Sequence, residues 1–219
     1  MRREALNTAT AALGEHRWDV DLEAGTVTFS AVADPARRLV ASAELVATLA
    51  PASGSILWGW AHPQGKAEGP VAKLRTHGEE AGIGLLSQAE VPFPPTATLQ
   101  PDTWIDDTAF VIGLAATELT GAAPAFVAPV EGGTRAVFLL DAGLPPLTVA
   151  GAFGALPHIL STTPLRDGRT SAWGLARLAG WQFEWADAAY SGARVSDASG
   201  HATFHFDESA RIIGFQPGA

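Results

Sequence analysis

The strongest constraint on the fold is the segment Ser53–Pro63, which reads Ser-Gly-Ser-Ile-Leu-Trp-Gly-Trp-Ala-His-Pro. Side chains of a β-strand point alternately to its two faces. A strand here would place Trp58, Trp60 and His62 on one bulky face and small residues on the other. Such a face is either the centre of a hydrophobic core or the floor of a pocket, and the residues leave both alternatives open. We favour the core, which predicts that Trp58 and Trp60 are mostly buried.

Together with the residues before it, this segment predicts an antiparallel meander of about four strands over 17–62. Apolar and acidic residues alternate from Trp18, Ala24-Gly25 turns the chain, and the alternation resumes at Val27. Helical patterns follow over about 70–77 and 106–119, with a second hairpin over 126–140. We therefore expect an α+β fold in which helices pack on an antiparallel sheet.

Two details of the middle of the chain can be predicted. In the helix over 106–119, we expect Phe110, Val111, Leu114 and Ala115 to form the buried stripe. The segment 90–101 is rich in proline, so we expect an extended connection without regular structure.

The last third of the chain is expected to add helices and antiparallel strands. A helix begins near Leu147, Thr170 is expected to cap a second one that ends at Gly180, and amphipathic strands follow. We divide the chain into an α+β region over 1–142 and a C-terminal region over 143–219, which is either a separate domain or part of the same one.

The charge distribution excludes common partners. The chain has 14 Lys and Arg against 23 Asp and Glu, a net charge of −9, and no basic cluster, which argues against nucleic acid. No apolar run reaches the length of a membrane span, and the first residues lack the apolar stretch of a signal peptide, so we expect a cytoplasmic, acidic protein. The absence of cysteine excludes disulfides, thiolate metal sites and cysteine nucleophiles.

We expect no metal and no cofactor. His201 and His205 would lie about 13 Å apart on a strand, too far to share one ion. Asp19, Asp21 and Glu23 fit the solvated face of an antiparallel sheet. The motifs of common hydrolases and nucleotide-binding enzymes are absent from the sequence.

A set of aromatic and ionisable residues remains as a candidate ligand site. Its aromatic members are Trp58, Trp60 and Trp104, and its ionisable members are His62, His77, Glu79 and Glu80. Each also has an ordinary structural role, because tryptophans fill cores and a histidine near a helix end stabilises the helix.

Four segments carry a resemblance to a known family. They are Trp18-x-x-Asp21, Ile56-Leu-Trp-Gly-Trp-Ala61, Leu74-Arg-x-x-Gly78-Glu79 with Gly82-Ile83 after it, and Val137-Phe-Leu-Leu140. Over residues 11–141 the chain resembles an uncharacterised bacterial family described only as a domain of unknown function. The resemblance implies the α+β fold and brings no activity.

Two hypotheses about function follow. The first is a non-catalytic protein that acts by protein–protein contact, with a homodimer as its simplest form. The second is a small-molecule-binding protein or enzyme, whose tryptophan-lined pocket would take a small apolar or aromatic ligand.

Overall fold

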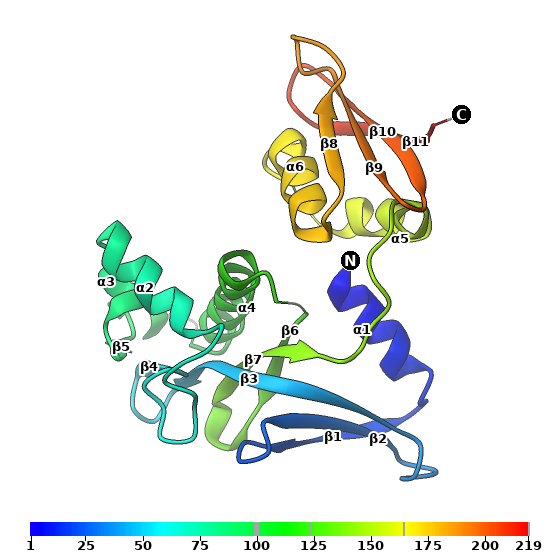
Figure 1. Cartoon of the computed structure of the whole chain (residues 1–219). Coiled ribbons are helices and arrows are strands. Elements are labelled where there is room, and N and C mark those ends of the chain that lie inside the picture. Colours follow the sequence, from blue (N-terminus) through cyan, green and yellow to red (C-terminus); the bar gives the residue numbers. More distant parts are fainter. Residues whose placement is uncertain (99–100, 123, 164, 219) are drawn as a thin grey trace. The chain divides into compact units, whose positions relative to one another are not determined.

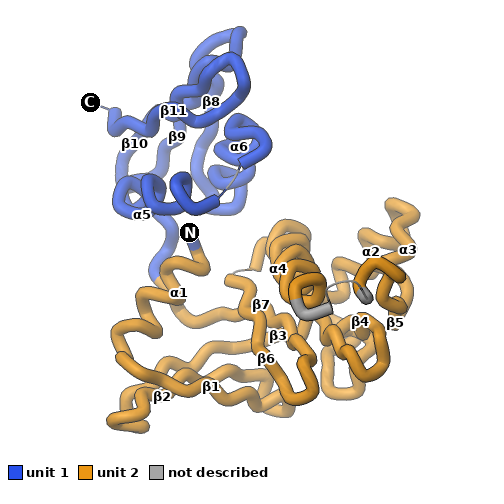
Figure 2. Tube along the Cα trace, turned by 180° about the vertical axis from the view of Figure 1, so that it is seen from behind, with its two compact units in different colours: residues 1, 145–219 blue, residues 2–144 orange. Residues whose placement is uncertain are grey.

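The computed structural model describes residues 1–98, 101–122, 124–163 and 165–218 (Figure 1). The chain divides into two compact units, coloured separately in Figure 2. The N-terminal unit is Arg2–Leu144, and the C-terminal unit is Pro145–Ala219 together with Met1. The division into regions 1–142 and 143–219 stays a prediction, and so does the question of whether they fold as separate domains.

Within its described residues, the N-terminal unit is built on a seven-stranded antiparallel sheet. β1 to β5 are neighbours in sequence order, β7 also pairs with β3, and β6 pairs with β7. These antiparallel pairings confirm the meander and the α+β class. The elements are α1 (Arg2–Ala11), β1 (His16–Asp21), β2 (Thr26–Ala31), β3 (Arg38–Ala50), β4 (Ser55–Trp58), α2 (Ala72–Ala81), α3 (Gly84–Ser87), β5 (Glu90–Pro92), α4 (Pro101–Thr120), β6 (Ala125–Pro129) and β7 (Arg135–Asp141), with 3₁₀ turns at Pro95–Thr98 and Glu131–Gly133.

The long strand β3 changes the face that it presents partway along its length. Ala43 and Leu45 pack into the core on the α1 side of the sheet, whereas Ala47 and Leu49 pack on the side of α2 and α4. The pairing of β3 with β7 shifts in register between Leu45 and Ala47, which makes Val46 the extra residue of a β-bulge. An extra residue sends the side chains that follow it to the opposite face. The bulge therefore lets one strand serve both cores.

The strand predicted within Ser53–Pro63 is shorter than expected. β4 ends at Trp58, so the prediction that Trp60 and His62 continue the same strand face is wrong. The Gly59 N–H donates to the Val46 carbonyl at 2.7 Å, and Gly59 lies so close to the bulged backbone of β3 that a side chain would not fit. The chain must turn at this point, so Trp60 and His62 lie in the turn, where Trp60 packs against the edge of the core that contains Trp58.

The apolar stripe of α4 is also displaced from its predicted position. The side chains that face the sheet are Ile105, Ala109, Ile112 and Ala116. Phe110, Val111 and Leu114 are instead 44%, 60% and 53% exposed, and Ala115 is half-buried. Gly113 explains which face of α4 turns toward the sheet, because a Cβ on it would lie 2.9 Å from the Ala125 Cβ. The helix therefore comes close to β6 at Gly113 and leaves Phe110, Val111 and Leu114 on its outer side.

The described part of the proline-rich segment contains regular structure, contrary to expectation, and residues 99–100 lie outside the described residues. Glu90–Pro92 forms β5, which pairs with β4 at the edge of the sheet. An edge strand tolerates proline because the N–H groups on its open side need no partner in the sheet.

The C-terminal unit packs two helices on a four-stranded antiparallel sheet of order β11-β10-β9-β8. Trp181 and Phe204 are buried in its core, and the Trp181 Nε1–H donates to the Leu147 carbonyl at 3.0 Å. Asp167, rather than Thr170, caps α6, because its carboxylate accepts the Thr170 N–H. The elements are α5 (Val149–Thr162), α6 (Gly168–Ala179), β8 (Gln182–Trp185), β9 (Gly192–Asp197), β10 (Gly200–Phe206) and β11 (Ile212–Pro217).

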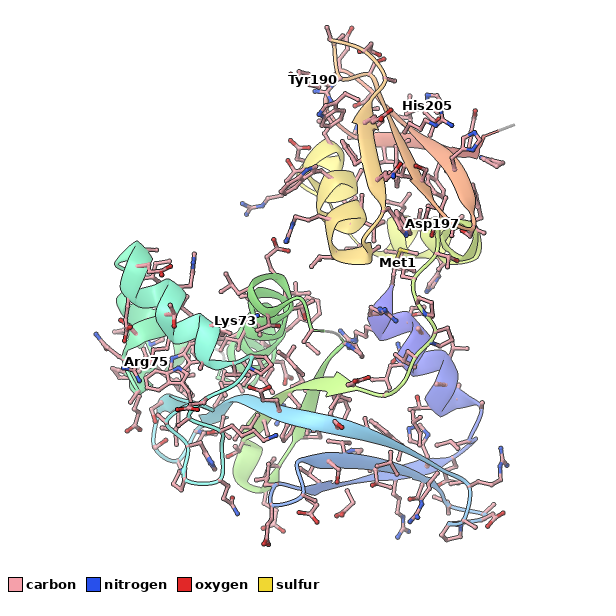
Figure 3. The ribbon with its side chains drawn as sticks, in the orientation of Figure 1. Met1, Lys73, Arg75, Tyr190, Asp197 and His205 are labelled. Atoms are coloured by element: carbon pink, nitrogen blue, oxygen red, sulfur yellow. The ribbon has the colours of Figure 1, made fainter. Side chains whose placement is uncertain are left out.

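Side chains of the β9–β10 hairpin and of Thr148, the residue before the helix, cap the first turn of α5. The Val149 N–H donates to the Asp197 carboxylate at 2.9 Å, and the next two N–H groups donate to the hydroxyls of Ser199 and Thr148, each at 3.0 Å. Burial acts to raise the pKa of Asp197, but the hydrogen bonds from Ser199 and Val149 outweigh it and hold the pKa below its usual value. Figure 3 labels Asp197 at this position.

Candidate functional site

The turn after β4 and the helix α2 bring the two main family-like segments together. Trp58 is 1% exposed, and its Nε1–H donates to the Leu85 carbonyl of α3 at 2.9 Å. Gly78 allows α2 and α3 to meet, since a Cβ on it would lie 2.7 Å from the Leu86 Cβ. These contacts assign Trp58 to the core.

Trp60 and α2 form a smaller polar and aromatic cluster, consisting of Trp60, Arg75 and Glu79. The Arg75 guanidinium lies 5.3 Å from the centre of the Trp60 ring, in cation–π contact. The Arg75 Nε donates to Glu79 Oε1 at 2.8 Å, one helical turn along α2. Figure 3 shows Arg75 on this helix. Sequence reasoning missed Arg75, although its spacing to Glu79 is that of a helical ion pair.

The indole nitrogen of Trp60 is buried and has no hydrogen-bond partner in the part of the chain that the structure describes. A buried donor without an acceptor costs about 1–3 kcal/mol, so few are found in folded proteins. Among the described residues, the half-buried Trp60 is therefore a member of the predicted tryptophan set whose buried indole nitrogen lacks an acceptor.

The other predicted site residues do not form one cluster. Trp104 lies on α4 and packs against Phe93, with ring centroids 4.8 Å apart. His77 is half-buried and Glu80 is exposed on α2, and neither side chain has a hydrogen-bonded or ionic partner among the described residues. No three His, Asp or Glu residues in the described ranges are arranged to hold a metal ion. A ligand-binding role for this set stays a prediction.

His62 lies in the turn beside Trp60 and is half-buried. Its Nδ1 accepts the Gln64 N–H at 3.1 Å, which fixes the neutral ring with its proton on Nε2. Partial burial lowers the pKa of His62 below its usual value.

A pH-dependent stability follows from this shift. Because the folded state holds His62 with a lowered pKa, the unfolded chain binds more protons near pH 6, and acid therefore favours unfolding. The contribution of His62 is fully present above the unfolded pKa near 6.5 and is lost as the pH falls through the lower, folded pKa. His62→Gln should flatten the fall of the melting midpoint between about pH 7 and 5. Thermal melts across this range would test it, with His77→Gln as the matched control, and an unchanged slope in His62→Gln would contradict it.

The comparison with family models found one match. Residues 1–143 match the model described as "Family of unknown function (DUF6882)", which is about two thirds of the chain. The chain belongs to the DUF6882 family. This confirms the resemblance to a family of unknown function. The comparisons with curated proteins and with solved structures found no match.

The DUF6882 match covers the N-terminal unit and so includes the Trp60–Arg75–Glu79 cluster and α4. In the described ranges, no helix is both long and apolar enough to cross a membrane. The most exposed apolar surface of this region that lies on one helix is the outer face of α4, formed by Phe110, Val111 and Leu114. The sequence contains a signal for this exposed face, because apolar residues occur on more than one face of α4.

Proposed function

We infer that the protein acts by contact with a partner protein, through the outer face of α4, and that it catalyses no reaction of its own. The supporting observation is that Phe110, Val111 and Leu114 are about half exposed on a helix whose opposite face is fully packed. A helix that is apolar on both sides is usually buried on both sides. A partner that covers the outer face would complete the burial.

The charges around this face favour a basic partner. Asp107 is exposed on α4 beside the apolar residues, and the chain carries a net charge of −9. One cation, Arg3 of α1, also contacts this face, with its guanidinium 5.4 Å from the centre of the Phe110 ring. We propose an amphipathic helix with apolar residues at helical spacing and Lys or Arg beside them as the occupant.

A second copy is a poorer occupant of the same face. Each copy carries a net charge of −9, and like net charges oppose association. Self-association through α4 is therefore an outcome that would contradict the proposed occupant.

A designed 14-residue amphipathic peptide, with leucines on one face and lysines on the other, would test the proposal by fluorescence anisotropy. Leu114→Glu should weaken binding at least about tenfold, because it places a charge in the centre of the contact. The control is Val130→Glu, since Val130 is 46% exposed outside α4. A peptide with glutamate in place of lysine should bind more weakly than the original.

Other results would contradict the proposal. Equal binding by Leu114→Glu and Val130→Glu would show that the peptide does not use α4. Turnover of a substrate that is abolished by His77→Ala or Glu79→Ala would show an enzyme. Saturable binding of a small ligand that is lost in Trp60→Phe would favour the tryptophan site. The bacterial origin, the cytoplasmic location and the absence of nucleic-acid binding stay predictions.

A further inference from the structure

The C-terminal unit, outside the DUF6882 match, has an open sheet edge at β8. The Ala186 N–H donates to the Gly192 carbonyl at 2.9 Å, which fixes the phase of the ladder between β8 and β9. Hydrogen-bonded residues alternate along an antiparallel strand. Glu184 therefore bonds to β9, while Phe183 and Trp185 direct their N–H and C=O groups away from the sheet. Among the described residues, no backbone or side-chain group pairs with those four groups.

Exposed aromatic rings lie along the same edge. Trp185 is 39% exposed, with Phe183 and Tyr190 on either side at centroid distances of 4.8 and 5.0 Å. Tyr190 itself is 50% exposed and adopts a φ of 57°, a conformation that costs a tyrosine about 1 kcal/mol or more. Hydrogen bonds hold it there, since Arg169 Nε donates to its carbonyl at 2.9 Å and its N–H donates to the Asp187 carbonyl at 3.2 Å. Figure 3 labels Tyr190 in this loop.

We propose that β8 binds an extended peptide segment of a partner as an added strand, with an apolar-cationic-apolar sequence. The free groups of Phe183 and Trp185 form the backbone hydrogen bonds. The peptide residues opposite Phe183 and Trp185 pack on the half-exposed rings of these two side chains. The residue between them lies opposite Glu184, an exposed carboxylate on the other face of the strand, and is a lysine or arginine. Glu184 then lies between Arg194 of β9 and the cation of the peptide.

Two observations favour a foreign peptide over a second copy. Antiparallel pairing of two β8 strands through their free groups would set Glu184 directly opposite the Glu184 of the other copy, which is unfavourable. The other edge of the sheet, β11, is interrupted by an irregularity in its pairing with β10 near His205 and ends at Pro217. Bulges and prolines protect sheet edges from pairing, and the regular strand β8 has neither.

The test uses the ¹⁵N-labelled full chain and the capped peptide Thr-Thr-Val-Lys-Val-Thr-Thr, observed by NMR. The backbone amide signals of Phe183 and Trp185 should shift saturably and become protected from hydrogen exchange. The peptide with glutamate in place of lysine should bind about fivefold more weakly, because an opposed charge pair on a sheet contributes up to about 1 kcal/mol.

A charge exchange decides the register. In Glu184→Lys the preference between the two peptides should invert, and the exposed position of Glu184 leaves the fold intact. Unchanged preference in this variant would overturn the proposed pairing. Unmoved Phe183 and Trp185 signals at millimolar peptide would overturn the site itself. Shifts that depend on protein concentration, with a dimer in sedimentation, would assign the edge to a second copy instead. None of these outcomes depends on α4, so this site and the proposed function can fail separately.

Discussion

Replacement of Trp58 by alanine should destabilise the N-terminal unit by about 3–5 kcal/mol, the usual cost of removing a buried tryptophan. Trp58 is 1% exposed and lies in the core between β3, α2 and α4. Its removal also leaves the Leu85 carbonyl without the Nε1–H donor that now lies 2.9 Å away. Urea unfolding of the full chain should show the N-terminal transition at a much lower midpoint.

Two control variants separate the causes of this loss. Trp58→Phe keeps most of the ring but removes the N–H donor, so it should cost less than the alanine variant. Trp18→Ala removes a tryptophan that is 36% exposed and touches Phe126 at a centroid distance of 5.9 Å. We expect that loss to stay below about 2 kcal/mol. Equal midpoints for Trp58→Ala and Trp18→Ala would show that Trp58 is not the centre of the core.

The sequence predicted the strands where hydrophobic alternation was regular and a turn residue marked each end. The hairpin of β1 and β2 follows from alternation about Ala24-Gly25, and in the structure Trp18 pairs with Phe29. The family-like segments over 11–141 lie within residues 1–143, which match the DUF6882 model. In each case the information is local, because neighbouring residues alone set the period and the turn.

The errors arose where a distant backbone decides the local structure. Nothing between Ser53 and Pro63 indicates that β3 bulges at Val46, yet that bulge ends β4 one residue before Gly59. Similarly, the face that α4 turns toward the sheet depends on close packing between Gly113 and Ala125. The apolar pattern of the helix alone does not reveal this packing. The candidate site was affected for the same reason. Trp58 and Trp60 were expected on one face, and the turn separates a core residue from a half-buried one.

The position of Gly59 leads to the second large effect. A Cβ at this position would lie 1.7 Å from the Leu45 carbonyl oxygen and 2.6 Å from the Leu45 carbonyl carbon, both atoms of the β3 backbone. No side-chain rotation relieves such an overlap, so β4 and the bulge must separate and the hydrogen bond from Gly59 to Val46 must break. Overpacking by a methyl group usually costs about 1–3 kcal/mol, and we expect Gly59→Ala to reach at least the upper end of that range.

Gly54→Ala is the matched control for Gly59→Ala, because the turn before β4 has a φ of 63° at Gly54 and no atom within 4 Å of a Cβ there. Its cost should be about 1–2 kcal/mol, from the left-handed backbone alone. The two variants thus separate backbone strain from steric overlap in the same hairpin. Urea midpoints would compare them, and amide shifts of Leu45 and Val46 should change only in Gly59→Ala. A Gly59→Ala protein as stable as Gly54→Ala would mean that β4 does not end against the bulge, and the separation of Trp60 from the Trp58 face would then lose its cause.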